Sequence, residues 1–349
     1  MNDTHSYIRM IDVKIIPIID VDNLCHIDPR ITKHWWSYIS SDTTTHHPNQ
    51  MNPTKKSSKA PPRLYPLLTF EELPKWLQSN SFIQKGYRRP QNSWSGCVRS
   101  SYQYLHNETV NIHSHLWGAM VFVFLLLETW CSPSNHESVT WHDPVGFGIF
   151  LAAAVFCMGA SALFHTANCH SPMVARKCHA LDYTGIVVLT VGSFYPCVYY
   201  GFYCDPYLQV TYLATITVAG VGAAYIVLSP GYSTPSYRWA RTTVFLALGL
   251  TAIVPVLHGL WLYGFIRLRQ EMGLLWLLAS GALYVVGALI YASRLPERWY
   301  PGRFDYFGAS HQIFHVCVVL AALSHYQCIT TAFEHRHGLQ KGLCDILQA

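Results

Sequence analysis

Two histidines lie four residues apart in the last apolar stretch of the chain, within segment 310–315 (SHQIFH). On a helix, side chains at this spacing lie one above the other on the same face, so both imidazoles could contact one metal ion. The pattern alone leaves two interpretations open: a metal site, or two histidines that hydrogen-bond to neighbouring helices.

Three further polar residues stand in or beside apolar stretches, namely Ser161, His165 and Asp182. Ionisable side chains at membrane depth are costly and are therefore functional candidates. Three imidazoles with a carboxylate nearby suit Zn²⁺ with an open position for water, which is a hydrolytic arrangement. We predict His165, His311 and His315 as metal ligands. We predict Asp182 as the catalytic base or as a group that orients a ligand, and Ser161, one turn from His165, as an additional hydrogen-bonding catalytic residue.

The other histidines of the apolar stretches fit this centre less well. His115 lies at the right depth, but we expect it to hydrogen-bond between helices rather than to bind metal. His258 and His325 lie toward the opposite ends of their stretches, and we interpret both as structural.

The composition identifies the elements that must position these residues. Of 349 residues, 51% are hydrophobic and 12% are charged, about half the roughly 25% charged residues of soluble domains. This composition excludes a disordered or coiled-coil chain. Each apolar run has nearly the length of about 20 residues that spans a bilayer, and Glu128 is the only Asp, Glu, Lys or Arg within them. We predict an all-α protein of seven transmembrane helices over residues 113–130, 144–165, 183–203, 207–228, 242–263, 273–292 and 307–329, with kinks at Pro196 and Pro255.

The basic residues predict the direction of the helices. Of the 24 Lys and Arg, 20 precede the first run or lie in the even-to-odd links, and 4 lie on the opposite side. Because basic residues favour the cytoplasmic side, we expect the N-terminus in the cytoplasm and the C-terminus outside. The four ionisable candidates then all fall in the inner part of the membrane. A G-protein-coupled receptor has the opposite orientation, and a retinal pigment needs a lysine within a span.

The chain divides into four predicted regions. Residues 1–63 form a disordered polar tail, and residues 64–112 form a cytoplasmic juxtamembrane segment. We expect this segment to contain a short amphipathic helix over 69–80, lying on the bilayer or packed on the protein. Residues 113–330 form the zinc-binding membrane domain, and residues 331–349 form a short extracytoplasmic tail. The 11 scattered cysteines have no zinc-ribbon spacing, and we interpret most of them as buried thiols.

Five motifs resemble those of the PAQR family, the progestin and adipoQ receptors, and particularly its adiponectin-receptor branch. The family also includes haemolysin-III-type proteins. In this chain the motifs are ETVNIHSH (108–115), SALFH (161–165), LDYTG (181–185), PERWYPGRFD (296–305) and SHQIFH (310–315), and the resemblance covers about residues 70–338. It implies a seven-helix fold with a cytoplasmic N-terminus, Zn²⁺ held by His165, His311 and His315, and Asp182 near a zinc-bound water. It also implies hydrolysis of ceramide-like amides and a role in lipid or zinc homeostasis. His113 stands where the receptor branch usually carries Trp.

Three functions follow as alternatives. The chain could be a zinc-dependent hydrolase of a ceramide-like lipid, or a ligand-sensing receptor in which zinc is structural and the cytoplasmic tail binds a signalling partner. A transporter is least favoured, because the polar residues cluster on one side of the membrane. We expect a multi-pass protein of the plasma membrane or an endomembrane, with the lipid bilayer as its environment and no nucleic-acid partner.

Overall fold

The structure is a computed structural model that describes residues 67–131, 136–229 and 235–344. The predicted tail 1–63 and the last five residues lie outside these ranges. The described chain is helical and contains seven helices long and apolar enough to cross a membrane, so the predicted all-α membrane fold is confirmed. The helices are α3 (Thr109–Cys131), α4 (His142–Ala167), α5 (Pro172–Gly201), α6 (Pro206–Leu228), the consecutive pair α7 (Arg238–Leu250) and α8 (Ile253–Glu271), α9 (Leu274–Ser293) and α10 (Ser310–Glu334).

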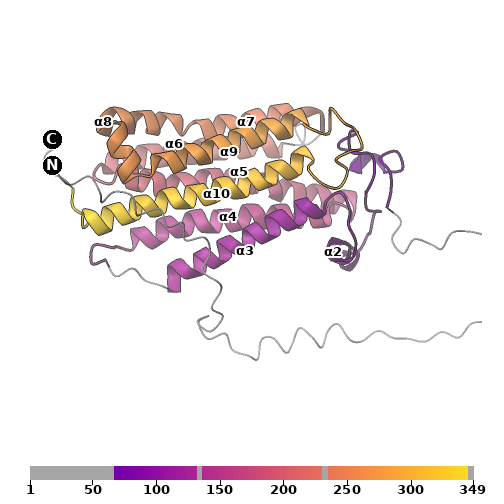
Figure 1. The fold of residues 1–349 in the computed structure, drawn as a ribbon, viewed down its shortest axis with the longest axis horizontal. Coiled ribbons are helices and arrows are strands. Elements are labelled where there is room, and N and C mark those ends of the chain that lie inside the picture. The colour runs from indigo at the N-terminus through magenta and orange to yellow at the C-terminus, as the bar shows by residue number, and fades with distance from the viewer. Residues whose placement is uncertain (1–66, 132–135, 230–234, 345–349) are drawn as a thin grey trace, which may run out of the picture. The chain divides into compact units, whose positions relative to one another are not determined.

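The spanning helices run alongside one another, with α5 and α10 between α3 and α4 on one side and the α6–α9 group on the other (Figure 1). A short helix, α2 (Trp94–Gln103), lies at the end of the bundle where α3, α5 and α10 begin and α4 finishes. We call this the α2 end, and we call the opposite end, where α10 finishes, the C-terminal end. The core along the axis is fully buried and aromatic-rich, with Phe122, Phe150 and Met158 among its members.

Two helix boundaries differ from the apolar runs. The third spanning helix, α5, begins at Pro172 rather than at 183, because its polar first turns, which contain Arg176 and Lys177, continue the helix beyond the apolar run. The fifth span is interrupted between α7 and α8 at Thr251 and Ala252. Thr251 is four residues before Pro255, whose ring clashes with that carbonyl and whose nitrogen has no hydrogen to donate. The kink predicted at Pro255 is therefore confirmed, whereas α5 continues through Pro196.

The amphipathic helix predicted over 69–80 is wrong. The segment contains only a 3₁₀ turn, Lys75–Leu77, preceded by Pro74, which disfavours helical backbone in the residue before it. An antiparallel bridge joins Leu68 to Tyr87 and holds the chain extended there. Leu73 is buried in a small cluster with Ile83, Tyr87 and Ala309, so the segment packs on the protein.

The C-terminal end is closed by the segment that follows α10. A π-helical turn, His335–Leu339, brings His337 into the bundle, and a disulfide joins Cys204 to Cys344. The prediction of buried thiols therefore fails for these two cysteines, although five of the other described cysteines are free and buried: Cys97, Cys157, Cys169, Cys178 and Cys328.

Candidate metal centre

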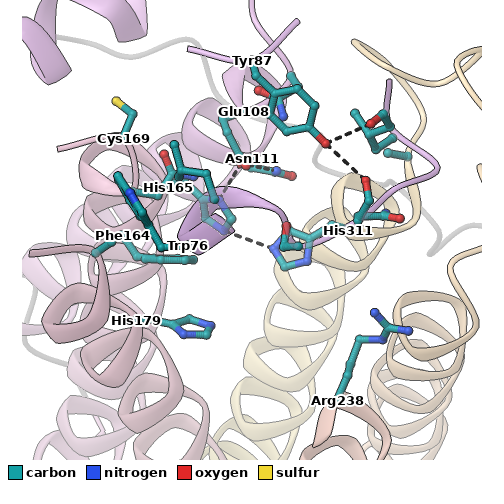
Figure 2. A pocket seen from close by; sticks show the side chains of 18 of the residues that line it. Trp76, Tyr87, Glu108, Asn111, Phe164, His165, Cys169, His179, Arg238 and His311 are labelled. Carbon is teal, nitrogen blue, oxygen red and sulfur yellow. Dashed lines mark hydrogen bonds and ion pairs between the residues drawn. The ribbon is translucent and has the colours of Figure 1, made fainter. Parts of the chain in front are cut away.

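The three predicted ligands meet at the α2 end. His165 lies in the last turn of α4, and His311 and His315 lie in the first two turns of α10. The Nε2 atom of His311 is 3.1 Å from Nε2 of His165 and 3.1 Å from Nε2 of His315. One nitrogen from each ring falls within 4.8 Å of the other two. Figure 2 shows His165 and His311 facing each other from the two helices. We call these residues the histidine triad; together they could hold a metal ion.

The partners of the outer nitrogens fix how these rings are protonated. Nδ1 of His165 lies 2.7 Å from the Glu108 carboxylate, and Nδ1 of His315 lies 3.1 Å from the Asn111 carbonyl oxygen. Both partners are acceptors, so each Nδ1 carries the hydrogen and each neutral ring presents an Nε2 lone pair to the centre. If Nε2 of His311 carries a hydrogen, it can donate that hydrogen to Nε2 of His165 or to Nε2 of His315, but not to both.

The remaining lone pairs repel unless a cation lies among them. In tetrahedral coordination, zinc–nitrogen bonds of 2.0–2.1 Å place the ligand nitrogens about 3.3 Å apart. The two separations from Nε2 of His311, both 3.1 Å, are close to this value, and all three nitrogens lie within 4.8 Å of one another. The residues therefore fit a metal ion bound by imidazoles.

Glu108 is a site residue that the sequence reasoning did not single out. It immediately precedes α3 and also accepts a 2.7 Å hydrogen bond from the Asn111 amide. Burial alone would raise the pKa of the Glu108 carboxyl. The adjacent His165 imidazole and the hydrogen bonds from His165 and Asn111 outweigh burial, so the pKa is lowered. Glu108 is therefore a carboxylate that orients His165, as outer partners of metal-binding histidines commonly do. Its signals in the sequence are its position as the first residue of the ETVNIHSH motif and an acidic side chain five residues before the first apolar run.

Asp182 and Ser161 are brought together by a close approach of α5 and α4. A Cβ atom on Gly185 would lie 2.8 Å from the Cα of Cys157, so a side chain at this position would push the two helices apart. One turn nearer the α2 end, the Asp182 carboxylate accepts a hydrogen bond from Ser161 and lies near the His165 ring. Both side chains are buried. Their catalytic roles remain predictions.

His115 does not make the hydrogen bond that the sequence reasoning expected. Its ring stacks on that of His315, with centroids 3.7 Å apart and planes 9° apart. It is buried, and neither ring nitrogen has a hydrogen-bond partner within the described residues. His115 therefore supports the triad by packing. For His325, a structural role was predicted, and its Nε2 lies 2.9 Å from the Ser193 carbonyl oxygen, a contact between α10 and α5.

A cavity of about 800 Å³ lies beside the triad at the α2 end, and His165 and His311 form part of its wall. Figure 2 shows these rings together with Trp76, Phe164 and His179 around the space. The wall contains aromatic and aliphatic side chains as well as polar ones. A cavity of this size and mixed lining suits a small molecule with polar and apolar parts.

Seven spanning helices and a buried three-histidine centre beside a cavity define a class of membrane protein with an internal candidate metal site. The haemolysin-III related family matches residues 103–326. The chain is 40% identical over 267 residues to "Adiponectin receptor protein" of Drosophila melanogaster, which covers 76% of this chain and 60% of the fly protein. It is 42% identical over 264 residues to "Progestin and adipoQ receptor-like protein 1" of Caenorhabditis elegans, with the same coverage of 76% and 60%.

A third relative is covered more completely. The chain is 35% identical over 283 residues to "ADIPOR-like receptor IZH2" of Saccharomyces cerevisiae, which covers 81% of this chain and 88% of the yeast protein. The alignments with the fly and nematode proteins span only about three fifths of those proteins. The chain belongs to the haemolysin-III related family and, within it, to the adiponectin-receptor-like PAQR proteins, as its motifs predicted.

Proposed function

We propose that His165, His311 and His315 hold Zn²⁺ and that the adjacent cavity accepts a ceramide-like lipid whose amide bond is hydrolysed there. The observation that carries the proposal is the convergence of one nitrogen from each triad ring beside a cavity whose wall includes His165 and His311. A bound Zn²⁺ supplies a Lewis acid and lowers the pKa of water toward neutrality.

The chain's own residues have separate tasks in this proposal. Glu108 and the Asn111 carbonyl hold the imidazoles in the required tautomer and orientation. Asp182 accepts a proton from the attacking water and delivers it to the departing amine, and Ser161 fixes the orientation of that carboxylate. The aromatic and aliphatic wall positions the lipid and excludes bulk water from the amide.

We infer that the α2 end faces the cytoplasm. Described basic residues gather at that end, among them Lys85, Arg99 and Lys177, as the positive-inside rule requires. The Cys204–Cys344 disulfide lies at the other end, and disulfides persist in oxidising compartments. A C-terminal epitope tag should be accessible from outside sealed cells or in the lumen of sealed organelles. A tag that is accessible from the cytoplasm instead would contradict this orientation.

Hydrolysis is tested with the full chain purified in lipid nanodiscs and a fluorescent ceramide. The wild type should release fatty acid, and the double variant His311→Ala, His315→Ala should not. His325→Gln is the matched control, because this buried histidine lies on the same helix, away from the triad, and should leave turnover unchanged. Equal turnover by the wild type and the triad variant would exclude the hydrolase.

The second candidate is a ligand-sensing receptor in which the metal is structural, and the receptor names of the fly and nematode relatives support it. Asp182→Asn separates the two candidates, because it leaves the three imidazoles in place while removing the proposed base. A ligand response that persists in this variant without hydrolysis favours the receptor, and a response lost together with hydrolysis favours the enzyme.

A further inference from the structure

The cavity beside the triad has basic side chains on its wall as well as histidines. Arg238 begins α7, and Arg294 follows α9; both line the cavity. Figure 2 shows the side chain of Arg238 extending toward the open space below His311, with the ring of His179 directed toward the same space from α5. Two guanidinium groups, one at the start of α7 and one just after α9, therefore border the same cavity as His165 and His311.

Within the described residues, neither arginine has a carboxylate partner. Nε of Arg238 is buried and has no hydrogen-bond partner. Arg294 donates a 2.6 Å hydrogen bond to the carbonyl oxygen of Ser79, which carries no charge. The Glu297 carboxylate is the acidic group whose charge acts on both arginines, but it forms no ion pair with either and instead accepts hydrogen bonds from Ser310 and Asn80. Burial and the neighbouring Arg238 charge lower the pKa of Arg294, so the two cations are close enough to repel each other.

Two cations held near each other with a single carboxylate, which is paired with neither, are costly, and the backbone at Arg294 adds to that cost. Arg294 caps α9 with a φ of 57°, a left-handed conformation that usually selects glycine at this position. Basic residues that only set membrane orientation need not line a cavity, whereas Arg238 and Arg294 are half-buried side chains on its wall. Arg298, on the same link, is exposed and does not line the cavity. Arg238 and Arg294 therefore differ from basic residues, such as Arg298, that could serve only to orient the helices in the membrane.

We propose that Arg238 and Arg294 form an anion subsite of the cavity that binds the phosphate group of an acidic membrane lipid. Guanidinium groups match phosphate oxygens in shape and charge, and a phosphate monoester carries up to two negative charges, which two arginines can balance. Arg176 and Lys177 lie on the same wall and increase its positive charge. Val227 and Leu228 provide apolar surface for the chain of the lipid.

This subsite also defines a substrate class. If the proposed hydrolysis occurs, the subsite makes phosphate-bearing lipid amides better substrates than neutral ones; this part of the inference rests on the proposed function. Binding of a phosphate-bearing lipid does not require hydrolysis, so the anion subsite and the hydrolase proposal can fail separately.

Binding is measured with the full chain in nanodiscs of neutral lipid, using short-chain fluorescent ceramide 1-phosphate and the corresponding neutral ceramide as probes. The wild type should bind the phosphorylated probe about tenfold more tightly, the effect of one or two charge-assisted hydrogen bonds. Arg238→Gln, Arg294→Gln should remove this preference, and Arg298→Gln should retain it. The triad variant His311→Ala, His315→Ala should also retain it, whatever its hydrolytic activity.

Three outcomes would overturn the proposal. They are equal affinity of the wild type for the two probes, a preference that survives in the double arginine variant, and binding of inorganic phosphate as tight as that of the phosphorylated lipid. The last would assign the subsite to a soluble anion. The first comparison uses only the wild type and is decisive even where the double variant does not fold; Arg238→Gln alone should reduce the preference.

Discussion

The two ends of the bundle each bury histidine with a carboxylate, but the hydrogen bonding differs. At the C-terminal end, His337 lies with Nε2 2.9 Å from Asp143 and Nδ1 2.8 Å from the hydroxyl of Ser138. Asp143 also accepts a 2.8 Å hydrogen bond from the Tyr200 hydroxyl. We call these four residues the C-terminal cluster. Every described donor there has an acceptor, so the cluster is complete without an ion.

In the triad, by contrast, the inner nitrogens face one another. Carboxylate and carbonyl partners accept the outer hydrogens of His165 and His315, and Nε2 of His311 lies 3.1 Å from Nε2 of each of these rings. The same residue types therefore form a satisfied hydrogen-bond network at one end and a set of lone pairs aimed at a common point at the other. Buried histidine and carboxylate together do not indicate a metal; the direction of the unpaired nitrogen atoms does.

The largest expected effect is at the C-terminal cluster. Asp143→Ala leaves His337, Tyr200 and the backbone N–H of Thr140 without their acceptor and should destabilise the protein by about 3 to 5 kcal/mol, as loss of one member of a buried polar network does. Thermal unfolding in detergent measures this loss, and bound metal should remain in the folded fraction. Glu334→Gln, which removes an exposed carboxylate 3.6 Å from His136, should change the melting temperature little. Equal effects of the two variants would contradict a structural C-terminal cluster.

Gly185→Ala tests whether the contact between α4 and α5 positions the triad end. The added methyl group would lie 2.8 Å from backbone of Cys157, so we expect destabilisation of about 1 to 3 kcal/mol through overpacking, together with weaker metal binding through displaced His165. Gly222→Ala is the control, since nothing lies within 4 Å of its added Cβ. Unchanged stability and metal content in Gly185→Ala would show that the helix contact does not position the site.

Glu108→Gln sharpens the comparison at the triad itself. The neutral amide loses the charge that orients His165, and metal affinity should fall about 10- to 100-fold, as for other outer partners of metal ligands. Competition with a fluorescent zinc chelator measures the affinity. The exposed Glu71→Gln should match the wild type. Unchanged affinity in Glu108→Gln would remove this residue from the site.

The smallest effect is expected at His115. His115→Phe keeps an aromatic ring against His315 and removes ring nitrogens that have no partner, so stability should change by no more than about 1 kcal/mol. Metal content should stay at the wild-type value. Loss of the metal in this variant, with folding intact, would make His115 a ligand rather than a packing residue.

The sequence predicted the seven spans because uncharged runs of this length have few alternatives to a transmembrane helix. It also anticipated the meeting of His165 with His311 and His315, since alternating helix direction places all three at one depth. The early start of α5 was missed, because Arg176 and Lys177 resembled a polar link. No local pattern disclosed the Cys204–Cys344 disulfide, whose cysteines are 140 residues apart. The role of Glu108 likewise depends on a contact between the start of α3 and the end of α4, which only the packed bundle provides.

The central claim, that the converging triad binds zinc while the C-terminal cluster does not, is tested most directly by metal analysis of purified protein. Elemental mass spectrometry should find about one zinc per chain in the wild type, as for a single three-histidine site. It should find the same in folded His337→Gln, and little zinc in His165→Ala, His311→Ala or His315→Ala. Zinc retained by all three triad variants, or lost only from His337→Gln, would contradict the account.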